Sequence, residues 1–379
     1  MTAPSPAAAS SSPASSSAAA PGPADGTDLL ALTASLVDIP SVSRNERAVT
    51  DHLEAALRSS PWLTVDRHGD NLVARTTLGR RYRLVLAGHT DTVPENGNGR
   101  ARLDGDTLWG LGSCDMKGGV AVLLHLATTV AEPAVDVTYV FYAGEEIESE
   151  HNGLGHLLRD RPDLVAGDAA LLGEPTGAAI EAGCQGTLRL QVTLRGERAH
   201  TARPWMGRNA VHRLGGLLTA LDAYDARQPE LDGCRFREAL QAVGVEGGVA
   251  GNVVPDRATL VLNHRFAPDR TPEEAEAHVR SVVAPFLEEG DTVELVDMAP
   301  AAAPSHRHPV LAALVQRNDL EVRAKLGWTD VARFAAAGVP AANFGPGDPT
   351  LAHHVDERVD RADLDRVHSA LADLLHRGP

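Results

Sequence analysis

Short apolar runs alternate with amphipathic segments along most of this chain, and this alternation restricts its fold more than any other feature. Each apolar run has the length of a strand, and each amphipathic segment has the period of a helix. We expect strands at 83–87, 138–143, 169–172 and 340–344, and helices at 29–37, 48–57, 118–130 and 364–375. Strands that alternate with helices indicate an α/β fold, in which helices cover both faces of a mainly parallel sheet.

The middle of the chain has a different pattern, with two strands that alternate between apolar and polar side chains. The expected elements are strands at 187–195, 258–266 and 292–296 and helices at 209–224 and 272–287. Because 379 residues exceed the roughly 250–300 at which one core stops growing, we expect two domains. The pattern predicts an outer domain at 28–184 and 296–379, interrupted by a smaller α+β domain at 185–295.

Composition limits the location and the partners of the protein. The formal net charge of −16 argues against nucleic acid, because such a site must neutralise phosphates with clustered Lys and Arg. Residues 1–27 are almost wholly Ala, Ser and Pro and lack the features of a signal peptide, so we expect a disordered tail. No apolar run reaches the ~18 residues of a membrane span. Three widely spaced cysteines indicate no disulfide framework and favour a reducing cytoplasm.

Five polar motifs follow predicted strands or close loops, and ligand sites of open α/β sheets collect at the carboxyl ends of strands. These motifs contain His89 with Asp91, Asp115, the pair Glu145 and Glu146, Glu174, and His353 with His354. Taken singly, each is typical of a turn, a helix cap or a solvated surface. Taken together, two histidines and three carboxylates suit Zn²⁺, and two zinc ions need such a set with one shared carboxylate. One of the two adjacent glutamates is then free to act as a general base.

Three of these motifs resemble those of the di-zinc aminoacylase and carboxypeptidase family. They are GHTDTVP at 88–94, GSCDMKGG at 112–119 and GEE at 144–146. The resemblance implies a metal-dependent amide hydrolase. It also implies an α/β catalytic domain with a mixed, mainly parallel sheet, and it identifies the insertion at 185–295 as a ferredoxin-like dimerisation or lid domain.

The resemblance further implies two zinc ions per chain, for which cobalt can substitute. One ion would be held by His89, Asp115 and Glu174. The other would be held by Asp115, Glu146 and His353, so that Asp115 bridges the two ions. 

Catalytic roles follow from the same resemblance. Glu145 would take a proton from water and pass it to the leaving nitrogen. Asp91 would accept the far imidazole N–H of His89 and thereby fix the tautomer of that ligand. The peptide bond between Asp115 and Met116 is expected to be cis.

Two nearby residues are alternatives to these assignments. His354 competes with His353 as the C-terminal ligand, and the order of the family's terminal motif favours His353. Cys114 is adjacent to the bridging aspartate, but no histidine motif pairs with it as a base, so we expect it to fill space.

The insertion carries a motif of its own at 196–210. Family members use the equivalent of His200 to stabilise the oxyanion in the active site of the neighbouring subunit, which implies a homodimer. The alternative for His200 is an ordinary polar residue at the start of a loop. The run at 251–255, which contains Asn252, fits a substrate-binding strand of the same domain.

Four runs, at 174–176, 183–187, 326–334 and 343–349, resemble the branch of the family that hydrolyses N-succinyl-LL-2,6-diaminopimelate for lysine and cell-wall synthesis. Such a substrate is a small anionic N-acyl amino acid. Arg265 and Arg333 are candidates to bind its carboxylates, and Arg203 is a weaker one, because guanidinium groups suit carboxylates. A surface ion pair is the alternative for each of these arginines.

Other activities stay open at this point. Residues 184–187 and Pro349 depart from some desuccinylases. An acetylornithine deacetylase, a related N-acyl-amino-acid deacylase or a dipeptidase would use the same metal ligands with a different acyl pocket. A non-catalytic binding protein is disfavoured, because it would not need Glu145 as a base.

Overall fold

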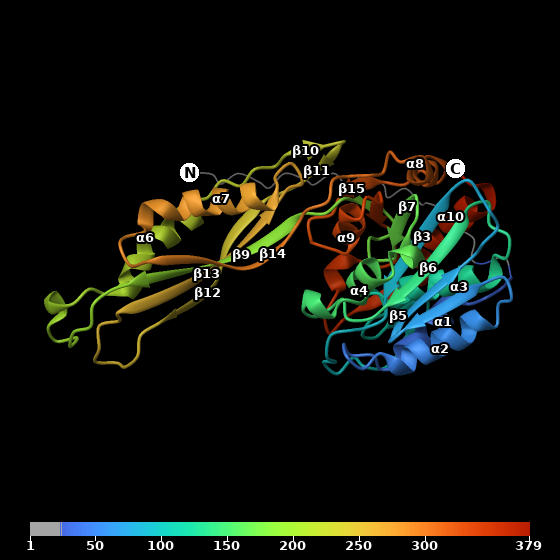
Figure 1. The fold of residues 1–379 in the computed structure, drawn as a ribbon. Coiled ribbons are helices and arrows are strands. Elements are labelled where there is room, and N and C mark those ends of the chain that lie inside the picture. Colours follow the sequence, from blue (N-terminus) through green and yellow to red (C-terminus); the bar gives the residue numbers. More distant parts are fainter. Residues whose placement is uncertain (1–22, 24) are drawn as a thin grey trace, which may run out of the picture.

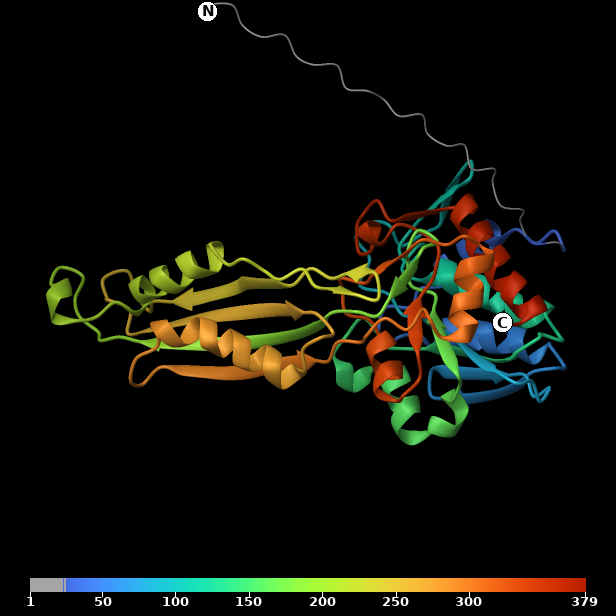
Figure 2. The same cartoon turned by 90° about the horizontal axis from the view of Figure 1, so that it is seen from above.

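The computed structural model describes residues 23 and 25–379, so most of the predicted tail at 1–27 lies outside the described residues. The described chain has two lobes side by side (Figure 1). The view from above shows the smaller lobe extending away from the larger one (Figure 2).

The larger lobe contains an eight-stranded sheet with the order β1-β2-β6-β3-β7-β16-β8-β15. Its strands are β1 (Thr64–His68), β2 (Asn71–Arg75), β6 (Asp136–Tyr142), β3 (Arg83–His89), β7 (Ala169–Leu172), β16 (Ala341–Asn343), β8 (Ile180–Ala182) and β15 (Val322–Ala324). The four central strands β6, β3, β7 and β16 are parallel to one another, whereas β1, β2 and β8 pair antiparallel with their neighbours toward the centre. The prediction of a mixed, mainly parallel sheet is therefore confirmed.

Helices cover both faces of this sheet. One face packs on α1 (Leu29–Val37), α2 (Arg47–Arg58), α3 (Lys117–Thr129), α8 (Pro309–Arg317) and α10 (Arg361–Arg377), and the other on α4 (Gly153–Asp160), α5 (Pro162–Val165) and α9 (Val331–Ala336). Successive residues of β3 alternate between the two cores: Leu84 and Leu86 belong to the first, Val85 and Ala87 to the second. Burial on both faces explains why the central strands are continuously apolar.

The smaller lobe has the element order β9 (Gly186–Arg195), α6 (Ala210–Asp222), β12 (Ala239–Gly247), β13 (Arg257–Phe266), α7 (Pro272–Val283) and β14 (Thr292–Ala299). Its sheet has the order β12-β13-β9-β14, and every pair is antiparallel. This arrangement confirms a ferredoxin-like fold. The sequence did not predict β12, because most of its side chains are exposed and show no regular alternation.

Two predicted ends in the smaller lobe are wrong. The helix expected to reach residue 287 stops at Val283, and Pro285 lies in the 3-10 turn that follows, where it has no N–H to continue the helix. The strand expected to end at 296 continues to Ala299 and still pairs with β9 there, so the boundary drawn at 295 falls inside β14. The division into domains stays a prediction.

Short elements complete the described chain. A three-stranded sheet contains β4 (Arg102–Asp104), β5 (Thr107–Trp109) and β17 (Arg358–Asp360), and a two-stranded one contains β10 (Glu230–Leu231) and β11 (Cys234–Arg235). Within residues 25–379, no helix is both long and apolar enough to cross a bilayer. The three cysteines are buried and unpaired.

Candidate metal centre

Three of the predicted ligand motifs meet at one edge of the large sheet. His89 is the last residue of β3, Glu146 follows β6, and Glu174 follows β7. These parallel strands are neighbours, so their carboxyl ends bring the three side chains together. Asp115 joins them from the turn before α3, and His353 from the segment before β17.

Asp115 lies at the centre of this cluster. Its Oδ1 is 3.1 Å from Nε2 of His89, and its Oδ2 is 3.6 Å from Nε2 of His353. The two histidines also approach separate glutamates: His89 is 4.0 Å from Oε1 of Glu174, and His353 is 2.9 Å from Oε1 of Glu146. The two triads proposed from the sequence are thus each assembled around opposite oxygens of one aspartate.

The cluster contains more carboxylates than imidazoles, so negative charge is in excess. Burial disfavours a charged imidazole, but Asp115 and Asp91 outweigh it and raise the pKa of His89 well above its ordinary value. The hydrogen bond with Glu146 outweighs burial and raises the pKa of His353 to about 9. Burial raises the pKa of Glu174 to about 7, although His89 opposes this shift. Each shift shows that the cluster favours added positive charge.

The donor set fits divalent metal ions. Oε1 of Glu174 is buried, and no described residue hydrogen-bonds to it, so it is an available ligand atom. Ligand atoms of His89, Asp115 and Glu146 all lie within 4.8 Å of one another. Imidazole nitrogens and carboxylate oxygens at such separations are the ligands that Zn²⁺ takes in proteins.

Asp91 connects the ligand on β3 to the loop after β6. Nδ1 of His89 lies 3.1 Å from the backbone oxygen of Asp91 and 3.5 Å from its Oδ1. The carboxylate of Asp91 accepts hydrogen bonds from the backbone N–H groups of Glu145 and Glu146, both at 3.1 Å. Burial alone would raise the pKa of Asp91, but the nearby imidazole of His89 holds it at about 2.

Glu145 is the carboxylate without a ligand contact. Its side chain is partly exposed and forms no hydrogen bond or ion pair with any residue that the structure describes. Desolvation, reinforced by Glu174 and Asp330, raises its pKa well above the ordinary value, although His89 opposes the shift. An unpaired carboxyl group with a raised pKa beside the ligands suits a general base.

The turn that carries Asp115 is held by a residue whose role sequence reasoning missed. Oε1 of Glu357 accepts the backbone N–H groups of Cys114 and Asp115, both at 3.1 Å, and Glu357 is 1% exposed. Its only signal was its place four residues after His353. The peptide bond between Asp115 and Met116 is cis, as expected.

Neighbouring candidates differ in their contacts. His353 enters the cluster, whereas Nδ1 of His354 accepts the backbone N–H of Asp356 outside it. Cys114 is completely buried, and burial raises the pKa of its thiol far above the usual range. The thiol therefore stays protonated, which agrees with a space-filling role.

The two main arginine candidates differ in their contacts. Nε of Arg333 donates to Oδ1 of Asp330 at 2.5 Å, and NH2 donates to Ser149 at 2.8 Å. Arg265, on β13 near the junction of the lobes, is partly buried, and its guanidinium has no hydrogen bond or ion pair with any described residue. Burial lowers the pKa of Arg265, with a further contribution from Arg189. Arg265 is therefore the freer of the two to receive an anion.

His200, Asn252 and Arg203 lie together but away from the metal ligands. The backbone N–H of Thr201 donates to Asn252, and that of Arg203 donates to His200. The strand β9 leaves the large lobe and has 10 residues, which corresponds to about 30 Å at 3.3 Å per residue. The loop at 196–209 follows β9 and lies at the far end of the small lobe (Figures 1 and 2). The loop that carries His200 therefore lies away from the metal ligands of its own chain.

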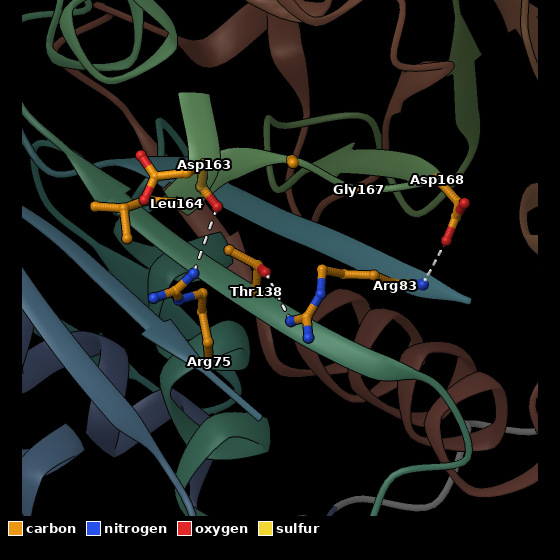
Figure 3. A pocket seen from close by; sticks show the side chains of 8 residues that line it. Arg75, Arg83, Thr138, Asp163, Leu164, Gly167 and Asp168 are labelled. Atoms are coloured by element: carbon orange, nitrogen blue, oxygen red, sulfur yellow. Dashed lines mark hydrogen bonds between the residues drawn. The ribbon is translucent and has the colours of Figure 1, made fainter. Parts of the chain in front are cut away.

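A pocket on the opposite sheet edge has no predicted site residue. It encloses about 370 Å³ between the start of β3, β6 and the segment after α5 (Figure 3). Its two arginines already have partners: NH1 of Arg83 donates to Thr138, and NH2 of Arg75 donates to Asp66. Because Arg83 begins the strand that His89 ends, this pocket lies at the other end of β3 from the metal ligands.

Comparisons with known proteins point to one family. The sequence profile of Peptidase family M20/M25/M40 matches residues 85–377. A Mycobacterium tuberculosis protein provisionally named succinyl-diaminopimelate desuccinylase is 51% identical over 351 residues, which cover 92% of this chain and 97% of the relative. A Corynebacterium glutamicum succinyl-diaminopimelate desuccinylase is 45% identical over 337 residues, 87% of this chain and 91% of the relative.

Solved structures share the fold at low sequence identity. An aminopeptidase from Bacillus cereus superposes with a TM-score of 0.76 at 18% identity, covering 92% of this chain and 97% of the other. A dinuclear metal-binding peptidase from Bacillus subtilis superposes with a TM-score of 0.66 at 16% identity, covering 92% and 96%. At this identity the likeness concerns the fold.

Proposed function

The chain belongs to peptidase family M20/M25/M40, and we propose that it hydrolyses the amide bond of N-succinyl-LL-2,6-diaminopimelate to succinate and LL-2,6-diaminopimelate. Relatives with that name are 45–51% identical over nearly the whole chain, which supports the choice of substrate. The structural observation that carries the proposal is the position of Asp115, whose two oxygens face His89 and His353.

We propose that two zinc ions bind here. His89, Asp115 and Glu174 would hold one, and Asp115, Glu146 and His353 the other. When bound, such ions supply Lewis-acid polarisation of the amide carbonyl and of water. The unpaired Oε1 of Glu174 and the excess of carboxylates support this assignment.

Glu145 is the proposed general base. Its carboxylate accepts a proton from the attacking water and then donates that proton to the leaving amide nitrogen, so that the carboxylate is regenerated in each turnover. Asp91 keeps Glu145 in place through the backbone N–H of that residue, and it orients His89 at the same time. The two functions of Asp91 couple the position of the base to that of a ligand.

Arg265 is proposed to bind a carboxylate of the substrate. It is partly buried, it lies on the strand that approaches the large lobe, and no described side chain pairs with it. A partly desolvated guanidinium gains more from a carboxylate than an exposed one does. Arg333 is a weaker choice, because Asp330 and Ser149 already occupy its donors.

The small lobe is proposed to form a homodimer. His200, with Asn252 and Arg203 beside it, lies too far from the metal ligands of its own chain to act on the substrate there. A second copy would place this loop over the other active site, where His200 could stabilise the oxyanion.

We also propose a cytoplasmic location, which the three buried, unpaired cysteines support.

The decisive experiment compares substrates for the metal-loaded protein. We expect hydrolysis of N-succinyl-diaminopimelate with a kcat/KM at least tenfold above those for N-acetylornithine, N-acetyl-diaminopimelate and simple dipeptides. A higher value for an acetylated substrate would replace this proposal with a general deacylase, and a higher value for dipeptides would replace it with a peptidase.

A further inference from the structure

The segment 41–46, before α2, lies along the motif that carries His89. Val42 and Thr92 form an isolated parallel bridge. The backbone N–H of Thr92 donates to Ser41 at 3.0 Å, and that of Ser43 donates to Thr92 at 3.1 Å. The hydroxyl of Ser41 also donates to the backbone oxygen of Thr90 at 2.7 Å. This segment is therefore fixed against the active-site motif by backbone and side-chain contacts.

Ser43 extends this contact to the charged group of Asp91. Its hydroxyl donates to Oδ2 of Asp91 at 2.7 Å. The same oxygen accepts the backbone N–H of Glu146, while Oδ1 accepts that of Glu145. A hydroxyl bound to a carboxylate forms a short, charge-assisted hydrogen bond, which restricts rotation of the carboxylate plane. The loop at 143–148, which carries the proposed base Glu145, is called the base loop here. The orientation of the carboxylate plane of Asp91 determines where the backbone amides of Glu145 and Glu146 lie in this loop.

One further contact joins the same segment to the base loop. Arg44 forms an exposed ion pair of 3.3 Å with Glu148. The segment thus also contacts the loop on the C-terminal side of Glu145.

We propose that Ser43 is a positioning residue for the base. It acts through Asp91 and sets where the carboxylate of Glu145 lies relative to the metal ligands. This inference rests on the proposed function of Glu145. Residues that orient a metal ligand or its partner typically contribute about 10–100-fold to affinity or activity, because a small displacement of a reacting group costs much of the rate.

Ser41 provides a matched control for Ser43. Both are serines of the same segment, and each hydroxyl makes one hydrogen bond of 2.7 Å. Ser41 contacts a backbone oxygen of Thr90 and neither Asp91 nor the base loop. A structural role shared by the segment would therefore affect Ser41→Ala and Ser43→Ala alike, whereas a positioning role would separate them.

The experiment measures kcat and KM of the metal-loaded variants on N-succinyl-diaminopimelate. Ser43→Ala should lower kcat by about 10–100-fold with little change in KM, and Ser43→Thr, which keeps the hydroxyl, should restore most of it. Ser41→Ala should keep kcat within about threefold. Equal kcat for Ser41→Ala and Ser43→Ala would overturn the proposal, as would a failure of Ser43→Thr to recover.

A second measurement does not depend on the substrate. Hydrogen exchange of a peptide covering 143–148 reports the amides of Glu145 and Glu146 directly, and it should be faster in Ser43→Ala than in Ser41→Ala. Unchanged exchange would overturn the positioning role even if the substrate assignment held. Faster exchange in a protein with no desuccinylase activity would reject the proposed function alone. If Ser43→Ala does not fold, Ser43→Cys, which keeps the size of the side chain and is a weaker donor, is compared with Ser41→Cys by the same criteria.

Discussion

Nε2 of His353 lies 2.9 Å from Oε1 of Glu146, and this pair faces the same aspartate as His89. His353 has a positive φ of 63°, a conformation that few non-glycine residues adopt, and its side chain is half exposed. The segment before β17 thus places an accessible imidazole beside the ligands that follow the strands of the large sheet. This relationship underlies the first prediction.

Two divalent ions should bind per chain, and a chelator should abolish activity. After reconstitution with excess Zn²⁺, elemental analysis of wild type should approach two equivalents. Glu146→Gln should bind the second ion more weakly, because an amide is a poorer ligand than a carboxylate. Glu150→Gln, on an exposed side chain of the neighbouring turn, is the control and should keep both ions. A plateau at one equivalent with full activity would contradict the bridged pair.

Glu145→Gln should keep both metals and lose turnover by about 10²–10⁴-fold, the usual contribution of a general base. The substitution preserves the shape of the side chain and the backbone N–H that donates to Asp91. Rates are compared with metal content in the same preparation, so that loss of the base is separated from loss of an ion. Near-normal turnover of Glu145→Gln would assign the base elsewhere.

Mixed dimers should test the role of His200. Glu145→Gln and His200→Ala proteins, each inactive alone, are mixed under conditions that exchange subunits. One active site of a mixed dimer then has an intact Glu145 and the intact His200 of the partner subunit, so activity should return. If subunit exchange is demonstrated and no activity appears, His200 does not act across the dimer.

The preference for succinyl over acetyl groups should depend on Arg265. Wild type should favour the succinyl substrate by more than about tenfold in kcat/KM, because an acetyl group leaves a partly buried charge unpaired. Arg265→Ala should remove most of that gap by slowing the succinyl substrate alone. Arg333→Ala is the comparison, and it should mainly lower thermal stability, because it leaves Asp330 without a charged partner. A gap that persists in Arg265→Ala would exclude this residue.

Acidification should destabilise the contact between α3 and α10. The rings of His125 and His368 lie 5.0 Å apart between these helices. Burial, followed by repulsion from His125, lowers the pKa of His368 from 6.5 to about 4. The unfolded chain therefore binds a proton at this histidine at a higher pH than the folded chain does. The contribution of His368 to the free energy of unfolding is full above pH 6.5, and it falls as the pH drops toward 4, by at most about 1.4 kcal/mol per pH unit.

The measurement is the free energy of unfolding by denaturant at several pH values between 4 and 7. His368→Phe should flatten the dependence in this window, because it removes the titrating group and keeps the ring. His52→Phe, on an exposed position of α2, is the control and should leave the slope unchanged. An identical slope in wild type and His368→Phe would contradict the prediction.

Local patterns in the sequence determined which residue types form the site. The strand that ends at His89, and those followed by Glu145, Glu146 and Glu174, are largely apolar runs, and burial on both faces of a parallel sheet favours such runs. The polar residue after each run marks the carboxyl end of its strand. Periodicity is a property of neighbouring residues, so one sequence was sufficient to find it.

Only the tertiary structure decided which of these residues meet. Glu357 reaches the backbone of Asp115 from 242 positions away, and Ser43 reaches Asp91 from 48. Arg265 and Arg333 are the same residue type in equally plausible runs, and the contacts of Arg333 with Asp330 and with the distant Ser149 separate them. The edge strand β12 was missed for a related reason: it packs on one neighbour and has little burial pattern. Contacts between distant segments depend on how whole elements pack, and a local pattern does not record that packing.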